Sequence, residues 1–312
     1  MRFSARPSSS AAPSDRDPTG VLYALGCFSF WGAFPVYFKL LYDVTALEVL
    51  AHRILWSVVV LLALMLWQGQ GAALVAALRD RRRLRFYLGT SLLISVNWLL
   101  YIWAVQNNRI VEASLGYYIN PLVNVVLGVL FLRERLNGRQ WSAIAIAAAG
   151  VLVLVVGHGA FPWVSLALAF SFGSYGLLRK KDGQSATLGL CVETVLLAPF
   201  ALLLLVGLTA NGVGAFGQRG RVTDLLLLAA GPITVVPLVL FLEAGRRLRL
   251  STLGLIQYLT PTLQFLLGVI VYREAFTAIH WAAFGCIWLA LALYSADAYL
   301  HQQSRLEPVK PG

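Results

Sequence analysis

Long apolar runs separated by short polar segments dominate this chain. They recur ten times, over approximately 20–41, 44–67, 85–106, 110–132, 139–157, 160–178, 186–208, 223–244, 250–272 and 277–299. Each run is long enough to cross a bilayer as a helix, because about 20 residues span a hydrocarbon core of about 30 Å. Strands of a membrane barrel would instead alternate over segments of about ten residues. The pattern therefore predicts an all-α integral membrane protein with ten transmembrane helices.

The two ends of the chain and its composition agree with this class. Residues 1–19 are rich in Ser, Pro, Ala and Arg and predict a disordered cytoplasmic tail, and residues 300–312 predict a second cytoplasmic tail. Of the 312 residues, 59% are hydrophobic and 12% are charged. A soluble domain usually has about a quarter charged residues, so the composition excludes that class.

Positive charges are distributed unevenly between the two predicted sides of the membrane. If the N-terminus lies inside, 19 of the 25 Lys and Arg residues fall in inner segments and four in outer segments. The positive-inside rule then predicts an N-in, C-in orientation. The net charge of +11 is explained by topology and lipid contact, and we do not expect nucleic acid as a partner.

The sequence repeats itself at an offset of 140 residues. "LGYYINPLVNVVLGVLFLRE" aligns without a gap on "LIQYLTPTLQFLLGVIVYRE", and Pro121, Gly128 and Glu134 recur as Pro261, Gly268 and Glu274. Two copies of a five-helix unit follow, over 20–157 and 160–299. Since five is odd, the second copy is inverted in the membrane. Inverted repeats of this kind are typical of secondary transporters.

Polar stripes interrupt the apolar runs at equivalent places in the two halves. The first stripe consists of Tyr117, Asn120 and Asn124. The second consists of Gln257, Thr260 and Gln264. Each lies beside a proline, Pro121 or Pro261, which frees a helical carbonyl and predicts a kink. The stripes predict a central cavity, and the alternative is that these side chains hold helices together.

Other polar and aromatic side chains near mid-span join the predicted lining of this cavity. They are Trp31, Asn97, Trp98, Tyr101, Ser171, Tyr175 and Tyr258. Such side chains could stack on an aromatic or apolar solute, and plain packing is the alternative.

Ionisable residues inside the spans are costly and predict a role by default. Glu48 and His52 are four residues apart and share a helix face, and Arg53 is turned about 100° away. Glu193 lies at a similar depth in the seventh run, so Arg53–Glu193 or His52–Glu193 is a candidate pair. The pair would serve as a protonation switch for coupling or as a structural ion pair between helices.

Several blocks resemble the drug/metabolite transporter superfamily, specifically RarD-type permeases of the EamA family. The blocks are "WGAFPVYFKL" at 31, "EVLAHRILWS" at 48, "NWLLYIWAV" at 97, "EASLGYYINPLVNVVLGVLFLRERL" at 112, "LAFSFGSYGLLRKK" at 168 and "LRLSTLGLIQYLTPTLQFLL" at 248. The resemblance covers nearly the whole chain after the tail. It implies two inverted EamA repeats and a central cavity formed mainly by helices 1, 3, 4, 6, 8 and 9.

The expected function is that of a secondary-active permease in the inner membrane of a bacterium. By resemblance it would export small amphipathic metabolites, amino acids or drugs related to chloramphenicol, by alternating access. A passive facilitator or a proton-uncoupled exchanger is the alternative. We find no nucleophile–base pair, no phosphate loop and no metal-spaced ligands, so we expect neither an enzyme nor a cofactor or metal. The partners would be a small solute, the lipid bilayer and, for coupling, protons. Two fused repeats are complete as a monomer, and a dimer stays open.

Overall fold

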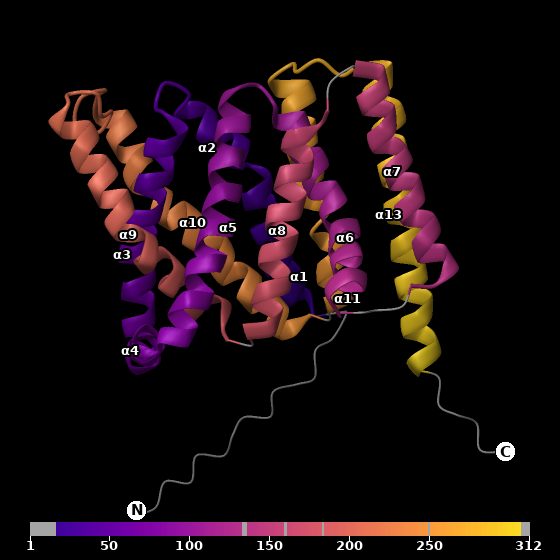
Figure 1. The fold of residues 1–312 in the computed structure, drawn as a ribbon, viewed down its shortest axis with the longest axis horizontal. Helices are drawn as coiled ribbons and strands as arrows, with labels where there is room; N and C mark the ends of the chain where they lie inside the picture. The colour runs from indigo at the N-terminus through magenta and orange to yellow at the C-terminus, as the bar shows by residue number, and fades with distance from the viewer. Residues whose placement is uncertain (1–16, 133–135, 159–160, 183, 249, 307–312) are drawn as a thin grey trace, which may run out of the picture.

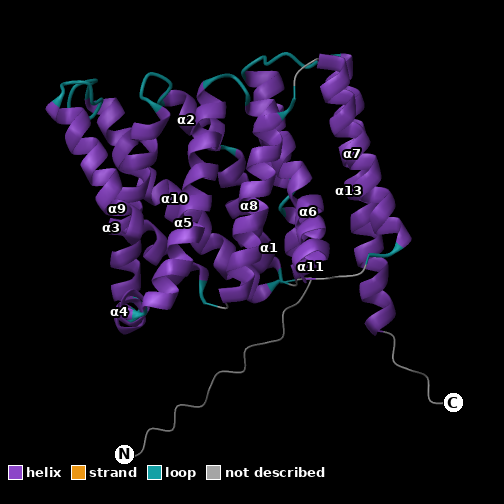
Figure 2. Ribbon diagram, in the orientation of Figure 1, coloured by secondary structure: helices purple, strands orange, loops and turns teal. Residues whose placement is uncertain are grey.

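A computed structural model describes residues 17–132, 136–158, 161–182, 184–248 and 250–306, and all regular structure within these ranges is helical (Figures 1 and 2). The helices of the first half are α1 (Pro18–Gly32), α2 (Phe34–Leu40), α3 (Ala46–Trp67), α4 (Gly71–Arg79), α5 (Arg81–Gln106), α6 (Ile110–Leu132) and α7 (Gly138–His158). Those of the second half are α8 (Trp163–Asp182), α9 (Ala186–Ala210), α10 (Arg221–Arg247), α11 (Leu250–Ile256), α12 (Leu259–Leu266), η1 (Leu267–Val271) and α13 (Ala278–Leu306).

Local side chains set where several of these helices begin. The Thr45 hydroxyl accepts a hydrogen bond from the Glu48 N–H at the start of α3, and the Ser185 hydroxyl accepts one from the Leu188 N–H at the start of α9. Such caps satisfy N–H groups that have no partner within a helix. Thr45 and Ser185 are 140 residues apart, so the sequence repeat extends to these helix starts.

Nine helices or joined helices within the described residues are long and apolar enough to cross a membrane. The remaining predicted run, 160–178, corresponds to α8, which does not belong to the nine. Its last turn carries Arg179 and Asp182, which lower its mean hydropathy. Multi-pass membrane insertion is therefore supported, and the number of ten spans stays a prediction.

The helix boundaries differ from the predicted runs in three places. The predicted inner loop around residues 70–84 contains the short amphipathic helix α4, and α5 begins at Arg81 because the Asp80 side chain caps it. Helix α13 continues to Leu306, so the first residues of the predicted C-terminal tail are helical. The predicted N-terminal tail lies outside the described residues except for 17–19, where Asp17 caps α1.

The outer surface of the bundle is apolar along most spans. Large side chains that point away from the protein include Leu22, Val59, Leu66, Leu130, Val156, Phe200 and Leu203. A water-soluble monomer rarely exposes contiguous apolar surface on this scale, whereas hydrocarbon tails solvate it. This surface identifies a protein that is surrounded by lipid.

Helices from the two halves pack against each other throughout the bundle. Helix α7 packs on α13 at one end of the view, and α3 packs on α9 at the other (Figure 1). Between them α6 and α5 contact α8, while α12 and α10 contact α1. At Gly116 the backbones of α6 and α8 approach so closely that a Cβ would lie 2.7 Å from the carbonyl oxygen of Ser165. The core is thus built from contacts between halves, with no separation into two independent domains.

Candidate functional site

The first predicted polar stripe joins helix α6 to helix α8. The Asn120 amide donates to the Ala169 carbonyl at 3.1 Å, and the Asn124 amide donates to the Asn120 side-chain oxygen at 3.1 Å. Asn120 is buried, whereas Asn124 is largely exposed. Both amides therefore donate within the protein, that of Asn120 between helices and that of Asn124 within α6.

The second stripe joins α12 to α1 in the equivalent way. The Thr260 hydroxyl donates to the Phe28 carbonyl at 2.9 Å, and the Gln264 amide donates to the Trp31 carbonyl at 3.2 Å. Asn120 and Thr260 are separated by the repeat offset of 140, and so are Asn124 and Gln264. Asn120 and Thr260 thus each bond to the helix that begins the opposite half, and so does Gln264, whereas Asn124 bonds within its own helix.

Gln257 does not share a buried face with Thr260 and Gln264, contrary to the predicted stripe. Its side chain is exposed, because the helix breaks between Ile256 and Leu259 and helical periodicity is lost across the break. Pro261 has no N–H, and the carbonyl of Gln257 accepts from the Thr260 N–H at 3.1 Å instead. Pro121, by contrast, lies inside the uninterrupted helix α6.

Asn97 links α5 to α8 by hydrogen bonds. Its amide donates to the Leu168 carbonyl at 3.1 Å and to the Ser171 hydroxyl at 2.9 Å. Asn97 is completely buried. Tyr258 lies elsewhere, in the apolar cluster formed by α6, α7, α12 and α13, so the structure does not bring it together with Asn97.

A series of aromatic contacts crosses the middle of the bundle. Ring centroids are 5.9 Å apart for Phe38–Tyr101, 5.7 Å for Tyr101–Tyr117, 6.1 Å for Tyr117–Phe172 and 6.3 Å for Phe172–Tyr175. The series begins on α2 and passes through α5 and α6 to α8. It brings together the predicted residues Tyr101, Tyr117 and Tyr175, and it adds Phe38 and Phe172, which lacked a polar signal in the sequence.

Arg53 lies at the α2 end of this aromatic series. Its guanidinium is 4.0 Å from the ring centroid of Trp98 and 5.9 Å from that of Phe38. Its Nε donates to the Thr234 hydroxyl on α10 at 2.9 Å. Arg53 is 5% exposed, so it is a buried cation held by aromatic faces and one hydroxyl.

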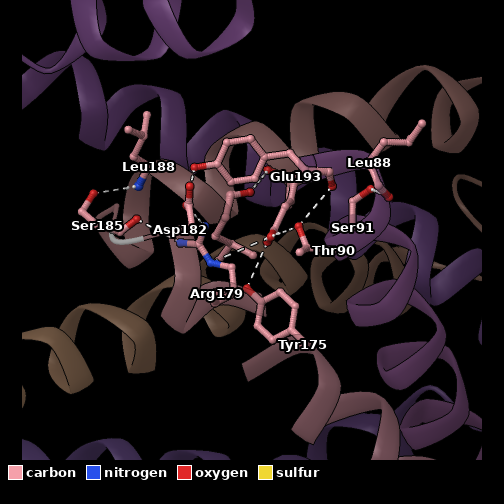
Figure 3. A network of polar contacts seen from close by, with 12 residues as sticks. Leu88, Thr90, Ser91, Tyr175, Arg179, Asp182, Ser185, Leu188 and Glu193 are labelled. Atoms are coloured by element: carbon pink, nitrogen blue, oxygen red, sulfur yellow. Dashed lines mark hydrogen bonds and ion pairs between the residues drawn. The ribbon is translucent and has the colours of Figure 1, made fainter. Parts of the chain in front are cut away.

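Glu193 lies at the other end of the series, in the network of Figure 3. Its carboxylate accepts from the Thr90 hydroxyl at 2.6 Å and from the Tyr175 hydroxyl at 3.0 Å, and Arg179 is its ion-pair partner at 4.0 Å. Arg179 also pairs with Asp182 at 2.7 Å. The network joins α5, α8 and α9.

The predicted pairing of Glu193 with Arg53 or His52 is wrong. Glu193 pairs with Arg179, which is one of the 19 Lys and Arg residues counted in the predicted inner segments. Glu48 and His52 do share a face, but that face is directed toward the segment before α10. The Glu48 carboxylate accepts from the Ala215 N–H at 2.6 Å, and the His52 ring lies 5.2 Å from that of Phe216.

Two cavities of the described structure lie away from the polar stripes. One of about 250 Å³ is lined by Arg109, Glu112, Trp163 and His280, among others. The other, of about 410 Å³, is lined by Glu48, His52, Thr209 and Phe216, with neighbouring apolar residues. Within the described ranges, no three His, Cys, Asp or Glu side chains are grouped as metal ligands.

Comparisons with known proteins agree on one family. Residues 18–156 match the model of the EamA-like transporter family. "Protein RarD" of Salmonella typhimurium is 44% identical over 286 residues, covering 92% of this chain and 97% of the relative. "Chloramphenicol-sensitive protein RarD" of Pseudomonas aeruginosa is 32% identical over 292 residues, covering 92% of this chain and 97% of the relative. A solved crystal structure at 20% identity superimposes with a TM-score of 0.56, covering 88% of this chain and 96% of that one.

Proposed function

Since the chain belongs to the EamA-like transporter family and is a multi-pass membrane transporter, we propose that it is a secondary-active permease of the bacterial cytoplasmic membrane. Two inverted five-helix halves, 20–157 and 160–299, would carry solute by alternating access, with both termini inside. The observation that carries this proposal is the pair of equivalent bonds from Asn120 to the Ala169 carbonyl and from Thr260 to the Phe28 carbonyl. Each joins the fourth predicted helix of one half to the first of the other.

Further equivalent contacts support the inverted arrangement. Helices α5 and α6 contact α8, and their counterparts α10 and α12 contact α1. The fifth helices of the halves, α7 and α13, pack on each other, and so do the second helices, α3 and α9. An arrangement in which halves exchange equivalent contacts is what an inverted-repeat transporter requires, because the two halves exchange roles as access alternates.

The proposed solutes are small amphipathic molecules, namely metabolites, amino acids or drugs. The aromatic series from Phe38 to Tyr175 supports this class, because ring faces accept apolar and aromatic groups. The name of the Pseudomonas aeruginosa relative makes chloramphenicol the first solute to test on this chain. Export is the proposed direction.

Flux measured in proteoliposomes tests the proposal. Labelled chloramphenicol and labelled phenylalanine are followed with and without a pH gradient, and protein-free liposomes serve as the control. A carrier gives saturable flux that unlabelled solute on the opposite side accelerates. Flux that rises linearly with concentration and ignores the opposite side would identify the passive facilitator. Absence of flux for a full panel of amino acids and drugs would contradict the proposal.

Proton coupling is a second element of the proposal and rests on two buried groups. The Glu193 carboxylate is fully buried within a set of donors, and the His52 Nε2 is buried without a hydrogen-bond partner among the described residues. Both groups would gain or lose a proton during the cycle. A double variant, His52→Gln with Glu193→Gln, is expected to lose accumulation driven by a pH gradient. If it retains that accumulation at wild-type level, these residues do not couple protons.

A further inference from the structure

Arg53 is a buried cation whose hydrogen-bonding capacity is mostly unused. Its Nε donates to Thr234, whereas the structure gives its two terminal nitrogens no hydrogen bond to any described residue. Among the described residues no carboxylate approaches these nitrogens to within 4.0 Å, the ion-pair distance. Glu193, at the equivalent position of the other half, is by contrast held by two hydroxyls and an arginine.

This state of Arg53 is unusual because a guanidinium stays charged in proteins and presents five donors in a planar fork. Buried charges are normally paired, since removal from water is costly in a bilayer. Aromatic faces at 4.0 Å, 5.6 Å and 5.9 Å stabilise the cation from Trp98, Phe34 and Phe38. They do not accept its N–H donors, so the fork is left available to an oxyanion.

Tyr101 provides a second unused donor on a ring that, like Arg53, contacts Phe38. Its hydroxyl is buried and has no partner among the described residues, and its side chain is 3% exposed. The Phe38 ring lies 5.9 Å from the Tyr101 ring and 5.9 Å from the Arg53 guanidinium, so both groups contact the same ring. The Phe38 ring is thus contacted by a buried hydroxyl without a partner and by a guanidinium with unused donors. Buried polar groups are otherwise nearly always satisfied, so the unpartnered hydroxyl beside this cation indicates a built site.

We propose that Arg53 binds the carboxylate of the transported solute, that Tyr101 supplies an additional hydroxyl donor, and that the surrounding rings hold the solute's apolar body. This proposal rests on the proposed transporter function and names its substrate class as aromatic or apolar monocarboxylates. A carboxylate matches the guanidinium fork in geometry and in charge. Arg53 is the one cation among the described residues of this aromatic cluster, so its single charge balances a monoanion better than a doubly charged phosphate.

The test is a binding comparison between a carboxylate and its neutral isostere. The full chain is purified in an uncharged detergent, and its affinities for 3-phenylpropionate and 3-phenylpropanamide are measured by calorimetry. The wild-type protein is expected to bind the carboxylate at least about 10-fold more tightly than the amide, since hydrogen bonds to charged groups contribute this much or more. Arg53→Gln is expected to bring the two affinities to the same value, and Arg53→Lys to preserve part of the preference.

Tyr101→Phe keeps the proposal testable if Arg53 variants do not fold. It removes an atom that has no partner and retains the ring, so a merely structural tyrosine would tolerate it without loss of thermal stability. The proposal predicts a loss of carboxylate affinity of about 3- to 10-fold. Tyr118→Phe is the matched control, because the Tyr118 hydroxyl is bonded to Thr262 at 2.8 Å. It should lower the melting temperature and leave the preference for carboxylate unchanged.

The outcomes separate this inference from the proposed function. Equal affinities for carboxylate and amide in the wild-type protein would overturn the inference, and so would a carboxylate preference that survives both Arg53→Gln and Tyr101→Phe. If the wild-type protein meanwhile shows saturable flux of uncharged chloramphenicol, transport stands and only the assignment of Arg53 fails. Absence of saturable flux for every solute would remove the proposed function itself.

Discussion

The equivalent bonds of Asn120 and Thr260 allow the two interpretations of the polar stripes to be separated. Asn120→Ala removes the amide donation to the Ala169 carbonyl and the acceptor for the Asn124 amide, both at 3.1 Å. Thr260→Val keeps the side-chain shape and removes only the donation to the Phe28 carbonyl at 2.9 Å. If these side chains hold helices together, both changes lower stability with little effect on solute affinity.

The expected magnitudes follow from the number of bonds lost. A hydrogen bond between membrane helices contributes about 0.6 kcal/mol on average and up to about 1.7 kcal/mol. Thr260→Val should therefore destabilise by about 0.6–1.7 kcal/mol, because the Phe28 carbonyl lies inside α1 and is not left without its helical partner. Asn120→Ala loses two bonds and leaves a small void, so about 1–3 kcal/mol is expected.

Reversible unfolding in mixed micelles measures these changes, and flux per folded molecule is recorded in parallel. The Michaelis constant for any transported solute should change by less than about twofold. Ser142→Ala is the control, because the exposed Ser142 hydroxyl bonds only within its own helix, to the Gly138 carbonyl at 2.9 Å. Unchanged stability together with a tenfold higher Michaelis constant would refute the packing role and identify a solute contact.

Three further predictions concern packing, a helix cap and the buried carboxylate. Gly231→Ala should destabilise the protein by about 1–3 kcal/mol, because an added Cβ would lie 2.4 Å from the Trp56 backbone. Gly89→Ala is its control and should be neutral or stabilising, because an added Cβ there would meet no atom within 4 Å. Burial raises the pKa of Glu274 above its ordinary value of 4.5, although the first two N–H groups of α6 oppose the shift. The folded state then holds this proton more tightly than the unfolded state, so stability should fall as pH rises from about 4.5 and level off above the folded-state pKa. Glu274→Gln should remove that slope in unfolding titrations, and an unchanged slope would contradict the assignment. Glu193→Gln should cost about 1.5–3 kcal/mol in the same unfolding assay, since the buried carboxylate loses its ion pair with Arg179 and the charge that strengthens its bonds with Thr90 and Tyr175. A change below about 0.5 kcal/mol would contradict an energetic role for the pair.

Much of the fold was predictable because the bilayer imposes a length and an apolar composition on each span. The runs at 44–67 and 110–132 agree with α3 and α6 to within two residues. Helix α4 was missed because a short amphipathic segment has no comparable constraint. The break before Pro261 was anticipated, but its consequence for Gln257 was not. Helical spacing predicts a shared face only while the helix is continuous. Gln257 lies in the break between α11 and α12, so its side chain does not follow the face of Thr260 and Gln264.

The site was less predictable because helical periodicity places a residue on one face of its helix but does not say which other helix packs against that face. Arg53 and Glu193 are separated by the repeat offset of 140 and carry opposite charges, which invites a pairing between them. In the structure, however, each residue meets the third predicted helix of the opposite half and not the other residue: Arg53 donates to Thr234 of α10, and Glu193 accepts from Thr90 of α5. Glu193 finds its cation, Arg179, on α8, whereas the position equivalent to Arg179 in the first half is Lys39, which offers Arg53 no carboxylate. Arg53 and Glu193 are therefore not paired, and Arg53 keeps donors that no described residue accepts.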